Sequence, residues 1–360
     1  MVHPVAFFCN FARMTRQDNY DLSKHNTFRM NVKCAAYISY DSAAELEKID
    51  FSTLPQPVMH IGAGSNLLFT GDFPGTVLHS EIKYIKYVDM GFDEVPVMVG
   101  AGVCFDEFVA NTCANGLWGA ENLSLIPGEV GAAAVQNIGA YGVEVKDIIS
   151  GVVCYDTQER KKVKFTVGEC GYGYRESRFK GEDKGRYIVT AVLFRLSRKY
   201  SPRLDYKGVR SALGLGPDET PSDLTPQQVR DAIIRVRREK LPDPEVTGSA
   251  GSFFKNPVVS ALDFAHIIDV ARSRWGADAV VPNFILDSGF VKVPAAWMID
   301  RCGFKGAVEG GAAVYEGQPL VIVNASGSAS PQDVTALEER IINTVRDTFG
   351  VTLSPEVEHI

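Results

Sequence analysis

Three polar side chains, Arg175, Ser252 and Glu356, lie in local sequences that suit chemistry. Arg175 lies in a loop rich in glycine and tyrosine, where its planar guanidinium could clamp a carboxylate or a phosphate, although an exposed loop arginine would look the same. Ser252 follows a glycine and precedes two phenylalanines, so its hydroxyl could face an apolar pocket or be purely structural; the nucleophile motif Gly-x-Ser-x-Gly is absent there. Glu356 follows Pro355 near the C-terminus and precedes an apolar residue, which predicts a docked segment rather than a frayed tail.

Two glycine-rich loops could hold a phosphate-bearing ligand between them. The first, residues 62–66, follows an apolar run at 58–61, and the second spans residues 127–142. Glycine and alanine let the main chain pass close to a bulky ligand and leave peptide N–H groups free for phosphate oxygens. A Rossmann fingerprint needs a third glycine near position 67, where Leu67 stands, so the first loop is of another kind. A plain hairpin turn and a tightly packed Gly/Ala core segment are the alternatives.

Hydrophobic periodicity predicts mixed helices and strands in two lobes with a cleft between them. The expected strands cover residues 32–39, 58–61, 76–79, 82–88, 95–99, 148–156, 161–167, 187–196 and 320–324. The expected helices cover residues 42–49, 104–115, 225–239, 260–275 and 294–302, with a last helix that begins at Ser330 and is closed by Gly350.

A linker and a basic helix join the two halves. Residues 200–223 are rich in Ser, Pro, Gly and Asp, which marks a flexible loop, and Tyr206 within it is either a lid residue or a surface tyrosine. The helix at 225–239 carries arginines around one apolar side. A solvated basic face and a site for an anionic ligand explain this pattern equally well.

The composition is that of an ordinary globular protein of two or three domains. The chain has 360 residues, 45% of them hydrophobic and 22% charged, and its net charge of -7 argues against a nucleic-acid-binding surface. Seven scattered cysteines without a CxxC motif, and no histidine at metal-ligand spacing, favour a reduced, cytoplasmic protein without a metal site. No apolar run reaches the roughly 18 residues of a membrane span. Residues 1–13 are interpreted as an extension or a start-site artefact.

Seven motifs together resemble the UDP-N-acetylenolpyruvoylglucosamine reductases of peptidoglycan synthesis, over roughly residues 21–360. In chain order they are Gly-Ala-Gly-Ser-Asn at 62–66, Ile-Pro-Gly-Glu-Val-Gly at 126–131, Asn-Ile-Gly-Ala-Tyr-Gly at 137–142, Tyr-Arg-Glu-Ser at 174–177, Leu-Pro-Asp-Pro at 241–244, Gly-Ser-Phe-Phe-Lys-Asn-Pro at 251–257 and Pro-Glu-Val at 355–357. Each motif is weak alone, but the set in this order is specific. Tyr206 resembles the substrate-capping tyrosine of the longer form of the family.

The resemblance implies an α+β fold: a two-part FAD-binding module of the vanillyl-alcohol-oxidase type and a C-terminal α+β substrate-binding domain. The implied division is an N-terminal extension at 1–20, FAD-binding subdomains at 21–75 and 76–200, a linker with the capping loop at 201–224, a substrate-binding domain at 225–348 and a C-terminal segment at 349–360 that returns to the active site. It also implies a cytoplasmic protein, expected to be a monomer, that acts in cell-wall biogenesis and thereby in cell shape and division.

The implied reaction takes a hydride from NADPH through FAD to the enolpyruvyl ether of UDP-N-acetylglucosamine and yields UDP-N-acetylmuramate. By the family pattern Arg175 and Glu356 flank the substrate carboxylate, and Ser252 donates the proton. The implied substrate-binding residues are Tyr206, Lys240 and Asn256. The implied cofactor-binding residues are Gly62, Ala63, Gly64, Ser65, Asn66, Leu67, Pro127, Gly128, Gly131, Asn137, Gly139, Ala140, Tyr141 and Gly142.

Two rival functions remain at the level of sequence. Another FAD-linked oxidase or dehydrogenase of the same fold would not need Ser252 and Glu356 as a set for proton delivery. A non-catalytic protein that binds a flavin or a sugar nucleotide would be expected to have lost Arg175, Ser252 or Glu356, and all three are present. The sequence departs from the family pattern at residues 132–134, where three alanines replace residues that are often glycine, and in the capping loop, which matches only at its tyrosine.

Overall fold

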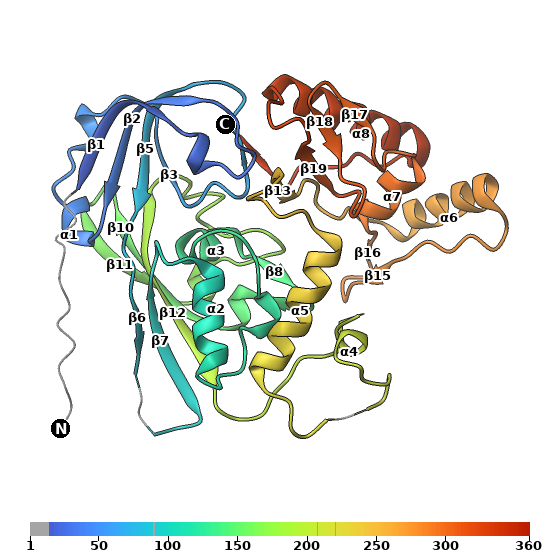
Figure 1. Cartoon of the computed structure of the whole chain (residues 1–360), viewed down its shortest axis with the longest axis horizontal. Helices are drawn as coiled ribbons and strands as arrows, with labels where there is room; N and C mark the ends of the chain where they lie inside the picture. The colour runs from blue at the N-terminus through green and yellow to red at the C-terminus, as the bar shows by residue number, and fades with distance from the viewer. Residues whose placement is uncertain (1–13, 89–90, 207, 220) are drawn as a thin grey trace.

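A computed structural model describes residues 14–88, 91–206, 208–219 and 221–360. Three main sheets with their covering helices form three regions (Figure 1). The first sheet has the order β1-β2-β5-β3, with β2 and β3 both parallel to the central β5. Its strands are β1 (Thr15–Asp21), β2 (Lys33–Tyr40), β3 (Val58–Ile61) and β5 (Phe73–Ser80), and the short helix α1 (Ala43–Leu46) follows β2.

The second sheet is antiparallel, with the order β11-β10-β12-β7-β6. Its strands are β6 (Ile85–Tyr87), β7 (Glu94–Gly100), β10 (Ile149–Asp156), β11 (Lys161–Phe165) and β12 (Tyr187–Ser197). The helices α2 (Phe105–Ala114) and α3 (Val130–Gln136) belong to this region, with the short strands β8 (Gly139–Ala140) and β9 (Val143–Glu144) after α3. Stacked Phe108 and Phe194 join α2 to β12 in the core, with ring centroids 4.3 Å apart.

The third region combines the antiparallel sheet β13-β19-β18-β17 with the small sheet β14-β16-β15. Its strands are β13 (Gly248–Ser252), β14 (Val258–Val259), β15 (Phe284–Ile285), β16 (Val291–Lys292), β17 (Val308–Glu309), β18 (Ala312–Val314) and β19 (Val321–Asn324). Its helices are α6 (Ala261–Trp275), α7 (Ala295–Arg301) and α8 (Pro331–Phe349). A complete capping box at Ser330 and Asp333 starts α8, and Gly350 in the left-handed conformation ends it.

One apolar core runs without a break from the first region into the third. Phe28 and Phe69 of the first region lie in the same buried cluster as Phe253 and Phe254, which follow β13. The chain after α8 adds to this join, because β20 (Glu358–His359) pairs in parallel with β4 (Leu67–Leu68) of the first region. The C-terminal segment 349–360 is therefore docked, as the sequence predicts.

Two domain boundaries differ from the predicted division. Residues 15–20, placed in the predicted N-terminal extension, lie in β1, which pairs with β2 along its length; residues 1–13 lie outside the described part of the chain. Helix α5 (Pro226–Lys240), placed in the predicted substrate-binding domain, packs on the second region beside α2 (Figure 1). Its Val229 and Ile233 share an apolar cluster with Trp118 and with Val209 of α4 (Val209–Ala212). Sequence periodicity identified the helix but not the surface on which its apolar side is buried.

Within the described ranges, no helix is long and apolar enough to cross a lipid bilayer.

Candidate active site

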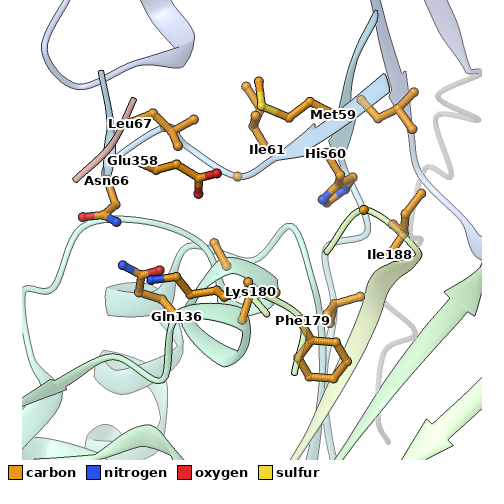
Figure 2. A pocket seen from close by; sticks show the side chains of 18 of the residues that line it. Met59, His60, Ile61, Asn66, Leu67, Gln136, Phe179, Lys180, Ile188 and Glu358 are labelled. Atoms are coloured by element: carbon orange, nitrogen blue, oxygen red, sulfur yellow. The ribbon is translucent and has the colours of Figure 1, made fainter. Parts of the chain in front are cut away.

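A cavity of about 720 Å³ lies between the first and second regions. In Figure 2 the segment from Met59 to Leu67 forms one wall, and Gln136, Phe179, Lys180 and Ile188 face it from the other. The residues that line it include eight of the predicted cofactor-binding set: Gly62, Gly64, Ser65, Asn66, Leu67, Pro127, Gly128 and Gly131. The two glycine-rich loops thus face each other across one cavity, as an elongated ligand with phosphates would require.

At particular glycines, the backbone of the two loops is too close to its neighbours for a side chain. Gly64 has a φ of +66°, and a Cβ there would overlap the carbonyl oxygen of His25. A Cβ on Gly131 would lie 2.8 Å from the Cβ of Ala101. On the facing wall, the side-chain nitrogen of Gln136 is buried and has no hydrogen-bond partner. A buried donor without a partner is costly, so the site fits a ligand that brings acceptor atoms.

Residues 137–142, the second half of the long glycine-rich segment, contact Arg175 through their backbone instead of lining the cavity, apart from Ile138. Nη2 of Arg175 donates to the carbonyl oxygen of Gly139 at 2.6 Å, and Nη1 donates to that of Asn137 at 3.4 Å. A Cβ on Gly139 would lie 2.9 Å from Nη1 of Arg175. Of the predicted cofactor-binding residues, Ala63, Asn137, Gly139, Ala140, Tyr141 and Gly142 are not among those that line the cavity.

Arg175 and Glu356 form a direct ion pair, although 181 residues separate them. Nε of Arg175 lies 3.0 Å from Oε1 of Glu356, and the two side chains are only 16% and 14% exposed. Arg175 has a φ of +58°, an uncommon conformation for a residue with a side chain. Burial raises the pKa of Glu356, while the positive charges of Arg175 and Lys180 pull it down without cancelling the shift. The carboxyl group therefore holds a proton at higher pH than an ordinary glutamate.

The backbone of Glu356 ties this pair to Ser252 and to the cavity. The N–H of Glu356 donates to the carbonyl oxygen of Phe253 at 2.8 Å, one residue beyond Ser252, which is exposed at the end of β13. The side-chain amide of Asn66, in the cavity wall, donates to the carbonyl oxygen of Glu356 at 3.0 Å. Arg175, Ser252 and Glu356 therefore come from distant segments to one place beside the cavity.

The three predicted substrate-binding residues are spread over a wider surface. Tyr206 packs edge-on against Tyr141, with ring centroids 5.4 Å apart, and is 45% exposed. The side-chain oxygen of Asn256 accepts a hydrogen bond from the N–H of Ala295 at 2.9 Å. Lys240 is the exposed last residue of α5.

Lys180 and Gln136 are residues that the sequence analysis did not find. Both line the cavity, and in Figure 2 they face Asn66 and Glu358 across it. The ammonium of Lys180 donates to the carbonyl oxygen of Arg175 at 3.2 Å, and burial lowers its pKa. For Lys180, the only available signal was its position five residues after Arg175 in the same loop. No hydrophobic pattern points to a lysine in a loop.

Comparison with known proteins shows similarity to one enzyme family. The family model described as "UDP-N-acetylenolpyruvoylglucosamine reductase, C-terminal domain" matches residues 243–360, and the model described as "FAD binding domain" matches residues 37–159. The UDP-N-acetylenolpyruvoylglucosamine reductase of Bacteroides fragilis strain YCH46 is 45% identical over 345 residues, which cover 96% of this chain and 100% of the relative. That of Porphyromonas gingivalis strain W83 is 43% identical over 347 residues, 96% and 99% of the two chains. The chain belongs to the UDP-N-acetylenolpyruvoylglucosamine reductase family.

The solved structure of a UDP-N-acetylenolpyruvylglucosamine reductase from Thermus caldophilus has the same fold as this family member. It superposes with a TM-score of 0.64 at 23% identity, over 96% of this chain and 98% of that one. The predicted α+β fold with a two-part FAD-binding module is therefore confirmed, as are the family and its FAD cofactor. The chain is an FAD-dependent oxidoreductase.

Proposed function

We propose that this protein reduces the enolpyruvyl ether of UDP-N-acetylglucosamine-enolpyruvate to UDP-N-acetylmuramate, with NADPH as the reductant, in peptidoglycan precursor synthesis. The observation that carries the proposal is the buried ion pair of Arg175 and Glu356, held beside Ser252 at the edge of the cofactor cavity. An arginine fork, a carboxyl group with a raised pKa and a hydroxyl would together surround one reacting centre in this proposal.

The two glycine-rich loops would hold FAD in the cavity. Gly62, Gly64, Gly128 and Gly131 allow close approach of the main chain, and Asn66 adds a side-chain amide. Bound FAD supplies a carrier that accepts a hydride from NADPH and passes it to the substrate. Asn137 and Gly139, also among the predicted cofactor residues, would act through the backbone carbonyls that position Arg175.

The side chains beside the cavity manage charge and a proton. Hydride addition to the vinyl methylene carbon makes a methyl group and leaves an electron pair on the neighbouring carbon, delocalised into the carboxylate. Arg175 would bind that carboxylate, and a protonated Glu356 would donate a hydrogen bond to it, which stabilises the developing charge. Ser252 would then transfer its hydroxyl proton to the carbon, and solvent would replace the proton on the serine. The net change is one hydride from NADPH and one proton from water.

The nucleotide end of the substrate would lie toward Tyr206, Lys240 and Asn256. Tyr206 projects from the linker onto Tyr141, where it could cap a bound sugar nucleotide. Lys240 offers an ammonium that could pair with a phosphate of the diphosphate.

We also propose a cytoplasmic monomer. Six cysteines of the described ranges are free thiols, which fits a reducing compartment. Size-exclusion chromatography with light scattering should give one species of about the 39.3 kDa chain mass, and a species of twice that mass would contradict the monomer.

The decisive experiment is anaerobic. Purified protein is reduced with NADPH until the flavin absorbance is bleached, and enolpyruvyl-UDP-N-acetylglucosamine is then added. The absorbance should return in step with formation of UDP-N-acetylmuramate. UDP-N-acetylglucosamine without the enolpyruvyl group serves as the control and should leave the flavin reduced. If only oxygen reoxidises the flavin, the protein is an oxidase of the same fold instead.

A further inference from the structure

A buried histidine and a largely buried glutamate join the first and second regions beside the cofactor cavity. His79 lies in β5 of the first region, and Glu129 directly precedes α3 of the second. Nε2 of His79 lies 2.8 Å from Oε1 of Glu129, and the two side chains are 7% and 12% exposed. On the other side of the ring, Nδ1 lies 3.2 Å from Oε1 of Glu81, an ionic contact without hydrogen-bond alignment.

Glu129 is an unexpected neighbour for phosphates. It lines the cavity, and it lies between Gly128 and Val130 in the loop that faces the first glycine-rich loop. A Cβ added to Gly62 would lie only 3.3 Å from Oε2 of Glu129, so this carboxylate of the second loop also approaches the first. An unpaired negative charge there would repel an anionic ligand, and a side chain only 12% exposed is weakly screened by solvent.

We propose that His79, as its imidazolium, neutralises Glu129 and so makes this cradle compatible with the diphosphate of the cofactor. His79 acts as a positioning residue: it touches Glu129 and not the cofactor. The inference rests on the proposed binding of FAD in the cavity, and it adds that His79 must be protonated for tight binding. The pair is neutral overall while His79 is protonated and becomes an anion when His79 loses its proton. Binding of a diphosphate therefore favours protonation of His79, and by linkage the affinity falls as the pH rises through its pKa.

The surroundings of His79 favour its charged form. Burial by itself lowers the pKa of His79, but the hydrogen bond to Glu129 and the charges of Glu129 and Glu81 more than reverse this, so the pKa lies above its ordinary value. Burial also raises the pKa of Glu129, although His79 pulls it down. The other titratable or charged groups that face the pair from the packed elements are Lys83, His25, Tyr37, Tyr40 and His60.

These neighbours do not titrate in the same way between pH 6 and 9. Burial lowers the pKa of His25 to about 4 and that of His60 to about 3, so both rings are neutral. Burial also raises the pKa values of Tyr37 and Tyr40, which keeps both phenols neutral. His359, which lines the cavity and binds Glu338 at 2.7 Å, has a raised pKa of its own. A variant at Glu129 leaves His359 in place, so it separates the two histidines.

The test measures release of FAD from the holoenzyme between pH 6 and 9, from the fluorescence of free flavin after dilution. A shift of one pKa unit in His79 between the loaded and empty states would make the wild-type dissociation constant about tenfold larger at the alkaline end. Glu129→Gln should bind FAD at least as tightly, and its pH step should move to lower pH, because His79 loses the hydrogen bond and the charge that do most to raise its pKa. His79→Gln should weaken binding about tenfold at pH 7, because Glu129 is then uncompensated.

The double variant separates charge compensation from a structural role. His79→Gln combined with Glu129→Gln should restore the affinity to within about threefold of wild type, since the variants share one interaction. His25→Gln, beside His79 but without a carboxylate contact, should keep the pH step. If the double variant binds FAD as poorly as His79→Gln alone, or the step in Glu129→Gln stays at the wild-type pH, the inference is wrong. Failure of the wild type to bind FAD at any pH would instead overturn the proposed function.

Discussion

Arg175 is the residue on which the contacts of the site converge. Its guanidinium reaches two main-chain carbonyls of one segment and the carboxylate of Glu356, and its own carbonyl accepts from Lys180. A side chain fixed at this many points is positioned before substrate arrives, which lowers the entropic cost of orienting it.

Replacement of Ser252 by alanine tests the proton donor. We expect turnover to fall at least about 100-fold, because a positioned acid typically contributes this much, whereas reduction of the flavin by NADPH should keep its wild-type rate. Stopped-flow absorbance measures the two half-reactions separately. Ser249→Ala, on the same strand, is the matched control. Wild-type turnover in Ser252→Ala would remove the serine from the mechanism while leaving the family assignment intact.

The raised pKa of Glu356 predicts a specific pH profile. Because burial raises this pKa, the protonated form persists above the ordinary glutamate range and is lost as the pH rises through the raised value. If the protonated form is the active one, wild-type turnover should decline on that limb. Glu356→Gln, which cannot ionise, should keep substantial turnover and lack this decline. A profile of Glu356→Gln that parallels wild type would show that another group causes the limb.

At the scale of elements, helix α5 connects the second region to the strand that bears Ser252. Its Arg230 forms a two-pronged ion pair with Asp106 of α2, at 2.6 and 2.8 Å. The helix spans 15 residues, about 22 Å at 1.5 Å per residue, and the chain then continues to β13. The pairing of β13 with β19, opposite Val321, then holds Ser252.

Removal of Arg230 should loosen this docking. Arg230→Ala leaves Asp106 partly buried and unpaired, so we expect a loss of about 3 kcal/mol in the free energy of unfolding. Urea titration at pH 7 measures it, and Arg238→Ala, on an exposed part of α5, should change it by less than about 0.5 kcal/mol.

The same pair predicts a dependence of stability on acid. Burial alone raises the pKa of Asp106, but the hydrogen bonds from Arg230 and Leu125 lower it below its ordinary value. A lowered pKa in the folded state gives stability above the unfolded pKa of about 3.9, and that stability is lost as the pH falls through the folded pKa. The difference between wild type and Arg230→Ala should therefore shrink in acid. A difference that stays constant down to pH 2 would argue that lost packing causes it.

Local signals were sufficient to predict most elements but not their partners. The strand at 58–61 and the helices at 260–275 and from Ser330 match the structure closely, because caps and periodicity are encoded within each segment. Strand β1 has a polar sequence and is mostly exposed, so it shows no apolar alternation from which it could be predicted. The apolar side of α5 predicted that this side is buried, but it did not indicate which of the three regions covers it.

At the scale of the whole molecule, the cofactor cavity is built from two regions that meet around it. Anything that binds this folded arrangement and not the unfolded chain stabilises it by mass action. FAD at about 100 times its dissociation constant should add about 2.7 kcal/mol to the free energy of unfolding. Thermal unfolding with FAD and with riboflavin, which lacks the diphosphate, compares the two. Equal stabilisation by both would mean that the glycine-rich loops do not hold phosphates.

The candidate site depends on contacts between distant segments, which local sequence patterns do not predict. Arg175 and Glu356 each stood out in their own segments, but their contact depends on the parallel pairing of β20 with β4 and on a core shared by the first and third regions. Gln136 and His79 had no local signature, Lys180 had only its closeness to Arg175 in the sequence, and Glu129 lay in a motif that gave no sign of its histidine partner. From the sequence, only the resemblance to a family grouped Arg175, Ser252 and Glu356 into one site.

The way Arg175 is held has a consequence for how such chains can diverge. Its two anchors within residues 137–140 are peptide carbonyls, which every amino acid supplies, so selection on the arginine does not extend to most side chains beneath it. Gly139 is the exception, because a Cβ there would press against the guanidinium. A saturation library across this segment should therefore tolerate replacements at Ala140 far better than at Gly139. Over evolution, residue 140 would be free to vary while residue 139 stays glycine.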